Sequence, residues 1–233
     1  MTERNHKIKF QDVLKKYLSE VIVIFIGISI SFWFDEWRDN RKDNESERKY
    51  LENMRSNLVQ DTLMLHYSLE NGQALKRSTH LLATFKSDAE IADSIDYHID
   101  NCSSYYGFMP NQTTYEELKQ NGHTRLINTD SLKKFILNHY TLVLPYCKEW
   151  TDVDKTQTMT QLIPELSNYF PVVPDTTNMV SVQNKIKALR MPKIRHLLLT
   201  NATYKQETLK TFAVTKISAR YVIKLIDKEL GKK

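Results

Sequence analysis

A long apolar run near the N-terminus dominates the hydrophobic pattern of the chain. Val21–Phe34 (VIVIFIGISISFWF) holds no charged residue. As an α-helix this run rises only about 21 Å, whereas the hydrocarbon core of a bilayer is about 30 Å thick. The wider stretch Tyr17–Trp37 supplies the missing length, and its aromatic ends are typical of membrane interfaces. The pattern therefore predicts one transmembrane helix over residues 17–37.

Two other interpretations of the run fit less well. A cleaved signal peptide needs small residues at a cleavage site beyond the apolar run, but Phe32–Phe34 continue the run past Ser29 and Ser31. A core helix of a soluble domain is normally apolar on one face, whereas β-branched residues surround this segment on all sides. We therefore retain the membrane span.

The charges on the two sides of the predicted span favour one orientation. Residues 1–16 form a short basic tail, and about as many Lys and Arg residues follow the span as precede it. The tail keeps a net positive charge, whereas Asp35, Glu36, Asp39 and Asp43 offset the bases after the span, although acids weigh little in the positive-inside rule. We predict a single-pass protein of the inner (cytoplasmic) membrane, with its N-terminus cytoplasmic and its C-terminal domain periplasmic.

Residues 38–233 are predicted to form an all-α extramembrane domain, a helical bundle. The chain has only 5 glycines and 6 prolines, too few for turn-rich sheets or for glycine-rich phosphate loops. We expect residues 38–71 to form a helical stalk that enters the bundle and ends at Asn71–Gly72, followed by a second helix over 73–86. Apolar residues recur along the stalk at helical spacing: Leu51, Met54, Leu58, Leu65 and Leu69.

Shorter helices are expected between clear breakers. One starts at Thr113 and ends at Gly122, and the next runs to Pro145, with a further break near Pro164. A long helix is predicted from Pro192 onward, and we expect it to pack against the helix that leaves the membrane. Its apolar face is predicted from residues that step by four: Leu209, Ala213, Ile217, Tyr221 and Leu225.

No arrangement of residues predicts catalysis. The chain has no HExxH, GxSxG or P-loop motif, and its 7 histidines are scattered. Asp93, Asp96 and Asp100 share a helix face, but a calcium loop needs a glycine and alternating oxygen ligands. We therefore predict that the protein is not an enzyme, with no catalytic residue, no cofactor-binding residue and no metal site.

Charge and cysteine content leave two questions open. The segment from Gln183 to Lys233 carries 13 Lys and Arg residues against 3 acids, which suits an acidic partner, anionic lipid or a solvated helix face. The helix after Asp130 begins with an acid and offers few base-reading side chains, so we do not expect nucleic-acid binding. An exported domain allows Cys102 and Cys147 to form a disulfide, and packed free thiols are the alternative.

Two stretches resemble a known protein family. The first carries an acid, a Gly-Ile step, a Trp and an Arg-Lys pair: Glu20, Gly27, Ile28, Trp37, Arg41 and Lys42. The second has a Tyr-Glu-Glu-Leu helix start, a Gly and a Leu-Ile pair: Tyr115, Glu116, Glu117, Leu118, Gly122, Leu126 and Ile127. Over most of residues 15–140 the chain resembles an uncharacterised single-pass bacterial membrane-protein family, a domain-of-unknown-function family common in Bacteroidota. The resemblance implies membrane attachment and a helical domain, and it implies no known activity.

The pattern as a whole favours a membrane-anchored interaction or scaffold module without catalysis. The lipid bilayer is its first expected partner, and a protein partner or a second copy of the chain is the second. A small-ligand sensor domain that relies on a partner for its output is the alternative. A membrane-attached enzyme is a third interpretation. It would require an active site assembled from residues that lie far apart in the sequence.

Overall fold

The computed structural model describes residues 2–172 and 180–231, and it describes side chains from Tyr17 onward except that of Ser19. The chain divides into two compact units, Met1–Lys49 and Tyr50–Lys233. The first unit is formed by the N-terminal part of helix α1, Thr2–Thr84. The described residues contain helices and no strand, which confirms the predicted all-α class.

The predicted transmembrane helix lies within α1. Among the described residues, no helix contains a stretch that is both long enough and apolar enough to cross a membrane. The predicted basic tail, residues 1–16, lies outside the described side chains. Every large apolar side chain from Val21 to Phe34 is at least 50% exposed within the described structure.

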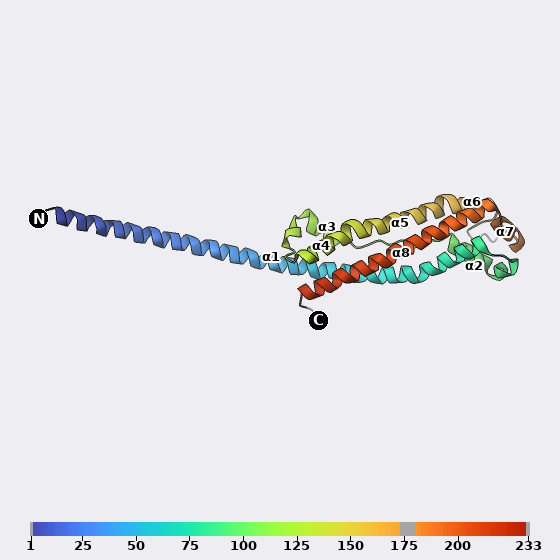
Figure 1. Ribbon diagram of the computed structural model, residues 1–233, viewed down its shortest axis with the longest axis horizontal. Coiled ribbons are helices and arrows are strands. Elements are labelled where there is room, and N and C mark those ends of the chain that lie inside the picture. The colour runs from blue at the N-terminus through green and yellow to red at the C-terminus, as the bar shows by residue number, and fades with distance from the viewer. Residues whose placement is uncertain (1, 173–179, 232–233) are drawn as a thin grey trace. The chain divides into compact units, whose positions relative to one another are not determined.

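The second unit is a bundle of long helices with short helical connections. After α1, the described elements are η1 (Asp88–Glu90), η2 (Ala92–Ser94), α2 (Ile95–Cys102), α3 (Thr113–Gln120), η3 (His123–Leu126), α4 (Asp130–Asn138), η4 (His139–Val143), α5 (Leu144–Gln157), η5 (Thr158–Leu162), α6 (Ile163–Ser167), α7 (Val182–Leu189) and α8 (Pro192–Glu229). Figure 1 shows α5 and α8 running alongside the second half of α1. As predicted, α8 packs against α1: Arg55 Nε donates to Asp227 Oδ1 at 2.5 Å near one end, and Lys76 Nζ donates to Gln206 Oε1 at 2.8 Å near the other.

Two apolar clusters form the core of this unit. The first joins α1 to α3, α4, α5 and the C-terminal half of α8, and its members include Leu58, Leu65, Tyr115, Ile136 and Phe212. The second joins the C-terminal end of α1 to α2, η5, α6, α7 and the start of α8. Burial of each large apolar side chain stabilises the fold by about 1.5–3 kcal/mol. The helical spacing of the apolar stripe places these residues on one face of α1. Its members Leu51, Met54, Leu58 and Leu65 are accordingly at most 1% exposed.

Helix α1 does not end where the sequence suggests. We predicted a break at Asn71–Gly72, but the helix continues to Thr84. A Cβ atom on Gly72 would lie 2.6 Å from Leu209 Cδ2. Gly72 therefore allows α1 and α8 to approach closely, which is a packing role and not a capping role. By contrast, Gly122 follows α3 with φ at 68°, so it ends that helix as predicted.

Two prolines are accommodated by π-helical turns. Pro145 and Pro164 lie in the first turns of α5 and α6, directly after the π-helical segments η4 and η5. Proline lacks an N–H group and its ring clashes with the carbonyl four residues earlier, and a π-turn widens the helix at such a point. At both sites the residue four positions earlier is a threonine whose hydroxyl donates back along the helix, at 2.7 Å. The predicted break near Pro164 is therefore wrong, and residues 130–167 are helical throughout.

The predicted apolar face of α8 is only partly right. Leu209 is 5% exposed, whereas Ile217 is 68% and Tyr221 is 45% exposed. The buried face of the C-terminal half instead follows Phe212, Ala219, Val222 and Ile226. A step of four residues turns 400°, so a strict four-residue series drifts around a helix of 3.6 residues per turn. Ile217 and Tyr221 lie where that drift leaves the core.

Both cysteines are buried free thiols. Cys102 belongs to the second apolar cluster and Cys147 to the first. Burial raises the pKa of the Cys102 thiol to about 12, so it stays protonated and unreactive at neutral pH. Of the two predictions for Cys102 and Cys147, the structure thus agrees with packed free thiols and not with a disulfide.

Candidate functional site

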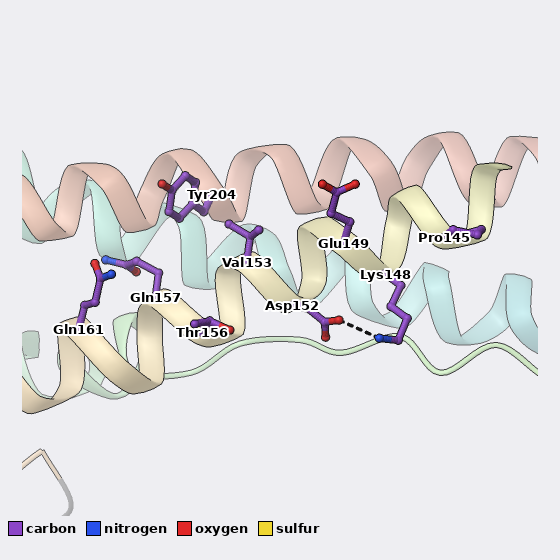
Figure 2. Close-up of a pocket in the computed structure, with 9 residues that line it drawn as sticks. All are labelled: Pro145, Lys148, Glu149, Asp152, Val153, Thr156, Gln157, Gln161 and Tyr204. Carbon is purple, nitrogen blue, oxygen red and sulfur yellow. Dashed lines mark hydrogen bonds and ion pairs between the residues drawn. The ribbon is translucent and has the colours of Figure 1, made fainter.

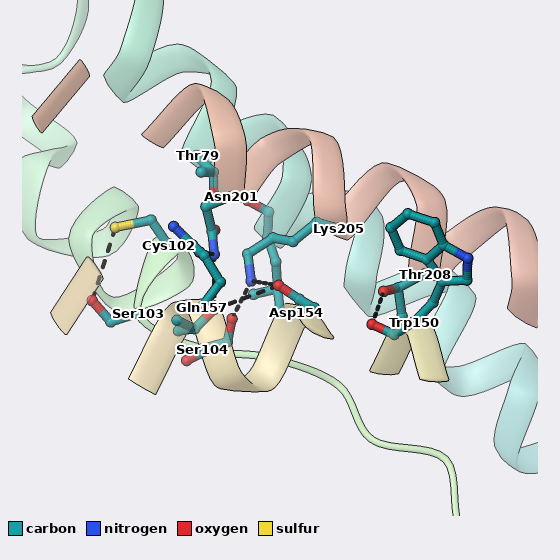
Figure 3. A network of polar contacts seen from close by, with 12 residues as sticks. Thr79, Cys102, Ser103, Ser104, Trp150, Asp154, Gln157, Asn201, Lys205 and Thr208 are labelled. Atoms are coloured by element: carbon teal, nitrogen blue, oxygen red, sulfur yellow. Dashed lines mark hydrogen bonds and ion pairs between the residues drawn. The ribbon is translucent and has the colours of Figure 1, made fainter. Parts of the chain in front are cut away.

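A buried ion pair between α5 and α8 is the most distinctive polar feature of the bundle. Lys205 Nζ lies 3.1 Å from Asp154 Oδ1, and the two side chains are only 3% and 5% exposed. The same ammonium donates to the backbone carbonyl of Ser104 at 2.7 Å. Figure 3 shows the pair enclosed by α5, α8 and the segment after α2. Three separate parts of the chain therefore meet at one charge.

Burial shifts both groups of this pair toward their neutral forms. Loss of hydration raises the pKa of Asp154, and the nearby ammonium of Lys205 opposes that shift. Loss of hydration likewise lowers the pKa of Lys205, against the attraction of Asp154. A pair of this kind adds little net stability over an apolar pair, but removal of one partner leaves a buried charge and costs about 3–5 kcal/mol.

An amide network extends the polar contacts along α8. The Nδ2 atom of Asn201 donates to Gln157 Oε1, and it donates to Thr158 Oγ1 at 2.8 Å. Gln157 Nε2 in turn donates to the backbone carbonyl of Leu197 at 3.2 Å. Two turns further along α8, Thr208 Oγ1 donates to the Trp150 carbonyl at 3.0 Å. These contacts set the register of α5 and η5 against α8.

An open groove lies beside this network. It has a volume of about 650 Å³ and is lined by Pro145, Lys148, Glu149, Asp152, Val153, Thr156, Gln157, Gln161 and Tyr204. Figure 2 shows these side chains along α5 and η5 and, for Tyr204, on α8. Lys148 and Asp152 form an ion pair at 2.8 Å within the groove. Gln157 lines the groove and also belongs to the buried network, so it connects the two.

A second buried polar cluster lies nearer the start of the bundle. Asp61 is 1% exposed and accepts a hydrogen bond from the Asn111 backbone N–H at 3.0 Å, while its Oδ2 atom has no partner among the described residues. Burial raises the pKa of this carboxyl group. The Tyr140 hydroxyl is also buried, with no partner in the described part of the chain, and the Tyr140 ring stacks on Tyr115 with centroids 4.3 Å apart. Burial raises the pKa of Tyr140, and the nearby Asp61 carboxylate raises it further.

His139 completes this second cluster. It is fully buried, and its Nδ1 atom lies 2.9 Å from Ser218 Oγ. Burial lowers the pKa of His139 to about 4, so the ring is neutral at neutral pH. The described structure gives its Nε2 atom no partner.

Neither buried cluster was predicted from the sequence. Asp154 and Lys205 lie far apart along the chain, and only their positions on the buried faces of two helices bring them together. A lysine at position 205, on the same helical face as the buried Leu198, Leu209 and Phe212, was the available signal. The described residues contain no group of three His, Cys, Asp or Glu side chains that could hold a metal ion. Asp96, one of the three acids on the predicted acidic face, pairs instead with Lys185 at 2.5 Å.

The geometry favours a structural role for the ion pair. A lysine with a lowered pKa is a potential nucleophile, but Lys205 is enclosed by helices and holds two acceptors. The exposed groove is lined by side chains that a ligand or a peptide can reach. The arrangement can therefore hold the bundle rigid and present a polar surface beside it.

Comparison with protein families identifies the chain. Residues 20–152, more than half of the chain, match the model of a family of unknown function, DUF6090. This match confirms the predicted resemblance to a domain-of-unknown-function family, over residues 20–152. No curated protein and no solved structure matches the chain. The chain therefore belongs to the DUF6090 family.

Proposed function

We propose that the protein is a membrane-anchored helical module that binds another protein and does not itself catalyse a reaction. Residues 17–37 would form the anchor, and residues 38–233 the domain that it holds at the membrane. The observation that carries the proposal is the exposed apolar segment of α1, in which every large apolar side chain from Val21 to Phe34 is at least half exposed.

The physics of that segment supports an apolar surrounding. A helix that is apolar on all sides gains nothing from packing one face on a bundle, and exposed apolar surfaces of this extent mark contact with a membrane or a protein. The charged residues Glu20, Asp35 and Glu36 lie at the two ends of the run. A carboxylate near a headgroup region can reach water. Residues 17–37 as a helix measure about 31 Å, which matches the hydrocarbon core.

The flanking groups support a defined position for the segment. Trp33 and Phe34 stack edge to face at 5.8 Å, and Trp37 lies 6.0 Å from the Arg41 guanidinium. Aromatic rings with a nearby cation are typical of membrane interfaces. We place the basic N-terminal tail in the cytoplasm and the bundle in the periplasm, because the tail keeps a net positive charge whereas acids offset the bases after the span.

Membrane fractionation and a topology reporter test this proposal. The full chain is expected in the membrane pellet after carbonate extraction, and a reporter fused after residue 233 is expected to be active only in the periplasm. Recovery of the chain in the soluble fraction would contradict the anchor. A reporter active only in the cytoplasm would reverse the orientation and leave the anchor standing.

The groove between α5, η5 and α8 favours a second candidate, an extracytoplasmic sensor of a small ligand. Its volume of about 650 Å³ is within the range of small-molecule sites. Gln157 would transmit occupancy of the groove to the buried amide network, because it contacts both. Native mass spectrometry of the purified full chain tests this candidate. A stoichiometric small-molecule adduct that Tyr204→Ala removes would support it, and a protein without any adduct would contradict it.

A further inference from the structure

An exposed apolar patch lies on helices α4, η4 and α8 of the bundle. It consists of Phe135, Leu142, Val214, Ile217 and Tyr221, whose exposed fractions run from 36% for Phe135 to 68% for Ile217. We call it the α4–α8 patch, after the helices that carry most of it. Single exposed apolar residues are ordinary on a protein surface. Five exposed apolar residues on adjoining helices are less common, and their exposure requires an explanation.

Contacts between the two helices make the patch continuous. The rings of Phe135 and Tyr221 meet edge to face, with centroids 4.7 Å apart. One turn further along the chain, His139 Nδ1 lies 2.9 Å from Ser218 Oγ. The pairs 135–221 and 139–218 show that the helices run antiparallel. The same register places Leu142 and Val214 at the next level, so the apolar residues follow one seam.

Exposed cations outnumber exposed acids on the described helices that carry the patch, where the exposed acids are Asp130 and Glu229. Lys134, Arg220, Lys224 and Lys228 are exposed on the same two helices, and none of these four has an ion-pair partner within the described residues. Lys210 is different, because it pairs with Glu207 at 2.6 Å. Two copies that met face to face through the patch would bring like charges together, which is unfavourable. Charge complementarity therefore favours an acidic partner.

The shape of the patch favours a helix. Val214, Ile217 and Tyr221 span two turns of α8, about 10 Å. A seam between two antiparallel helices accepts a third helix whose apolar residues recur every three or four positions. Acidic residues beside that apolar stripe would reach the lysines at the rim of the patch.

We propose that the α4–α8 patch is the docking surface for an amphipathic helix of a partner protein, with acidic residues flanking its apolar stripe. This inference deepens the proposed interaction function and rests on it. Apolar residues in the seam supply the affinity, and the basic rim orients the partner and speeds its association.

Site-specific photo-crosslinking in native membranes tests the inference on the full chain. A benzoylphenylalanine is placed at position 214 or 217 in the patch. Thr203, exposed on α8 outside the patch, and Tyr67, exposed on α1, are matched control positions. We expect one protein adduct at 214 and 217, at least about tenfold stronger than at 203 or 67. Mass spectrometry of the adduct is expected to find a crosslinked segment with helical apolar spacing and acidic flanks.

A charge-reversed variant sharpens the result. Lys224→Glu combined with Lys228→Glu should weaken the adduct at position 217 by about tenfold, because it reverses the sign of the rim. Thermal unfolding of the same variant checks that the bundle is intact. An intact variant with an undiminished adduct would contradict the role of charge.

The other outcomes separate this inference from the proposed function. An adduct of twice the mass of the chain would show a second copy on the patch, and a lipid adduct would show a membrane surface, so either result overturns the inference. A protein adduct at position 67 alone would move the interaction surface to α1 and leave the proposed function intact. No adduct at any of the four positions would count against both.

Discussion

The two parts of helix α1 carry similar apolar residues in opposite surroundings. Between Val21 and Phe34 the helix is apolar all round, and its large side chains are at least 50% exposed within the described structure. Between Leu51 and Leu82 one stripe of apolar residues is buried in the bundle, whereas Leu63, Met64 and Tyr67 lie off that stripe and are 64%, 46% and 62% exposed. Both parts of α1 are rich in apolar residues, but these residues surround the helix in the first part and are concentrated on one face in the second.

The difference shows what each segment requires. An amphipathic segment is satisfied by one neighbouring surface, which α5 and α8 provide. A segment that is apolar in every direction requires an apolar surrounding in every direction, and a bilayer provides that. Under the proposed function, the two parts of one helix would lie in two solvents, the bilayer and water.

Charges placed in the first segment should have the largest effect. Ile24→Arg combined with Ile28→Arg adds two cations to the apolar run, at a cost of about 2.5–3.5 kcal/mol each when they lie at the centre of a membrane span. We expect most of the protein to leave the carbonate-resistant membrane fraction, while the unfolding temperature of the bundle is unchanged. A variant that stays fully in the membrane would contradict the proposed anchor.

Loss of one partner of the buried ion pair should be the largest single effect on the bundle. Lys205→Met leaves Asp154 buried without its cation, and we expect a loss of about 3–5 kcal/mol in the free energy of unfolding, measured by urea denaturation. The double variant Lys205→Met with Asp154→Leu should recover most of that loss, because no buried charge remains. Equal losses in the single and double variants would show that the pair does not act as a unit.

A matched pair of leucines tests the stripe on α1 itself. Leu65 is fully buried and Leu63 is 64% exposed, two residues away on the same helix. Leu65→Ala should lower the free energy of unfolding by about 2–5 kcal/mol, because it removes buried contacts and leaves a cavity. Leu63→Ala should change it by less than about 0.5 kcal/mol. Similar effects in the two variants would mean that the stripe is wrongly placed.

Acidification should weaken the bundle through His139. Its pKa is about 4 in the fold, below the ordinary value of 6.5, so folding favours the neutral ring. The stability that depends on this ring is present above pH 6.5 and is lost as pH falls toward 4, by at most about 1.4 kcal/mol per pH unit. His139→Asn, which can keep the hydrogen bond to Ser218, should flatten the stability profile in that window. Parallel profiles for the two proteins would rule out this residue as the cause.

The sequence predicted the helical class, the buried stripe of α1 and the helix ends that depend on local chemistry. Gly122 ends α3 because glycine adopts a positive φ. These signals act over a few residues. Such local signals can be recognised in the sequence without knowledge of which helices pack together.

Features that depend on a distant neighbour were missed. Gly72 reads as a helix end, and only the approach of Leu209 explains it as a point of close packing. The four-residue series predicted Ile217 and Tyr221 in the core, but its drift around the helix leaves them 68% and 45% exposed. Asp154 and Lys205 became a site only when two separate helices brought them together. Which face of a helix is buried is decided by the helices that pack against it.

Cysteine accessibility along α1 tests whether residues 21–34 lie in the bilayer. Single cysteines are introduced from position 17 to position 49 in the full chain, and sealed native membranes are treated with a membrane-impermeant maleimide. Cys102 and Cys147 are buried in the bundle, so their background labelling should be low. The account predicts that positions 21–34 are protected until detergent is added, and that positions 40–45 label readily once the reagent reaches the periplasm. Uniform labelling from 17 to 49 in intact membranes would contradict the assignment of this segment to the bilayer.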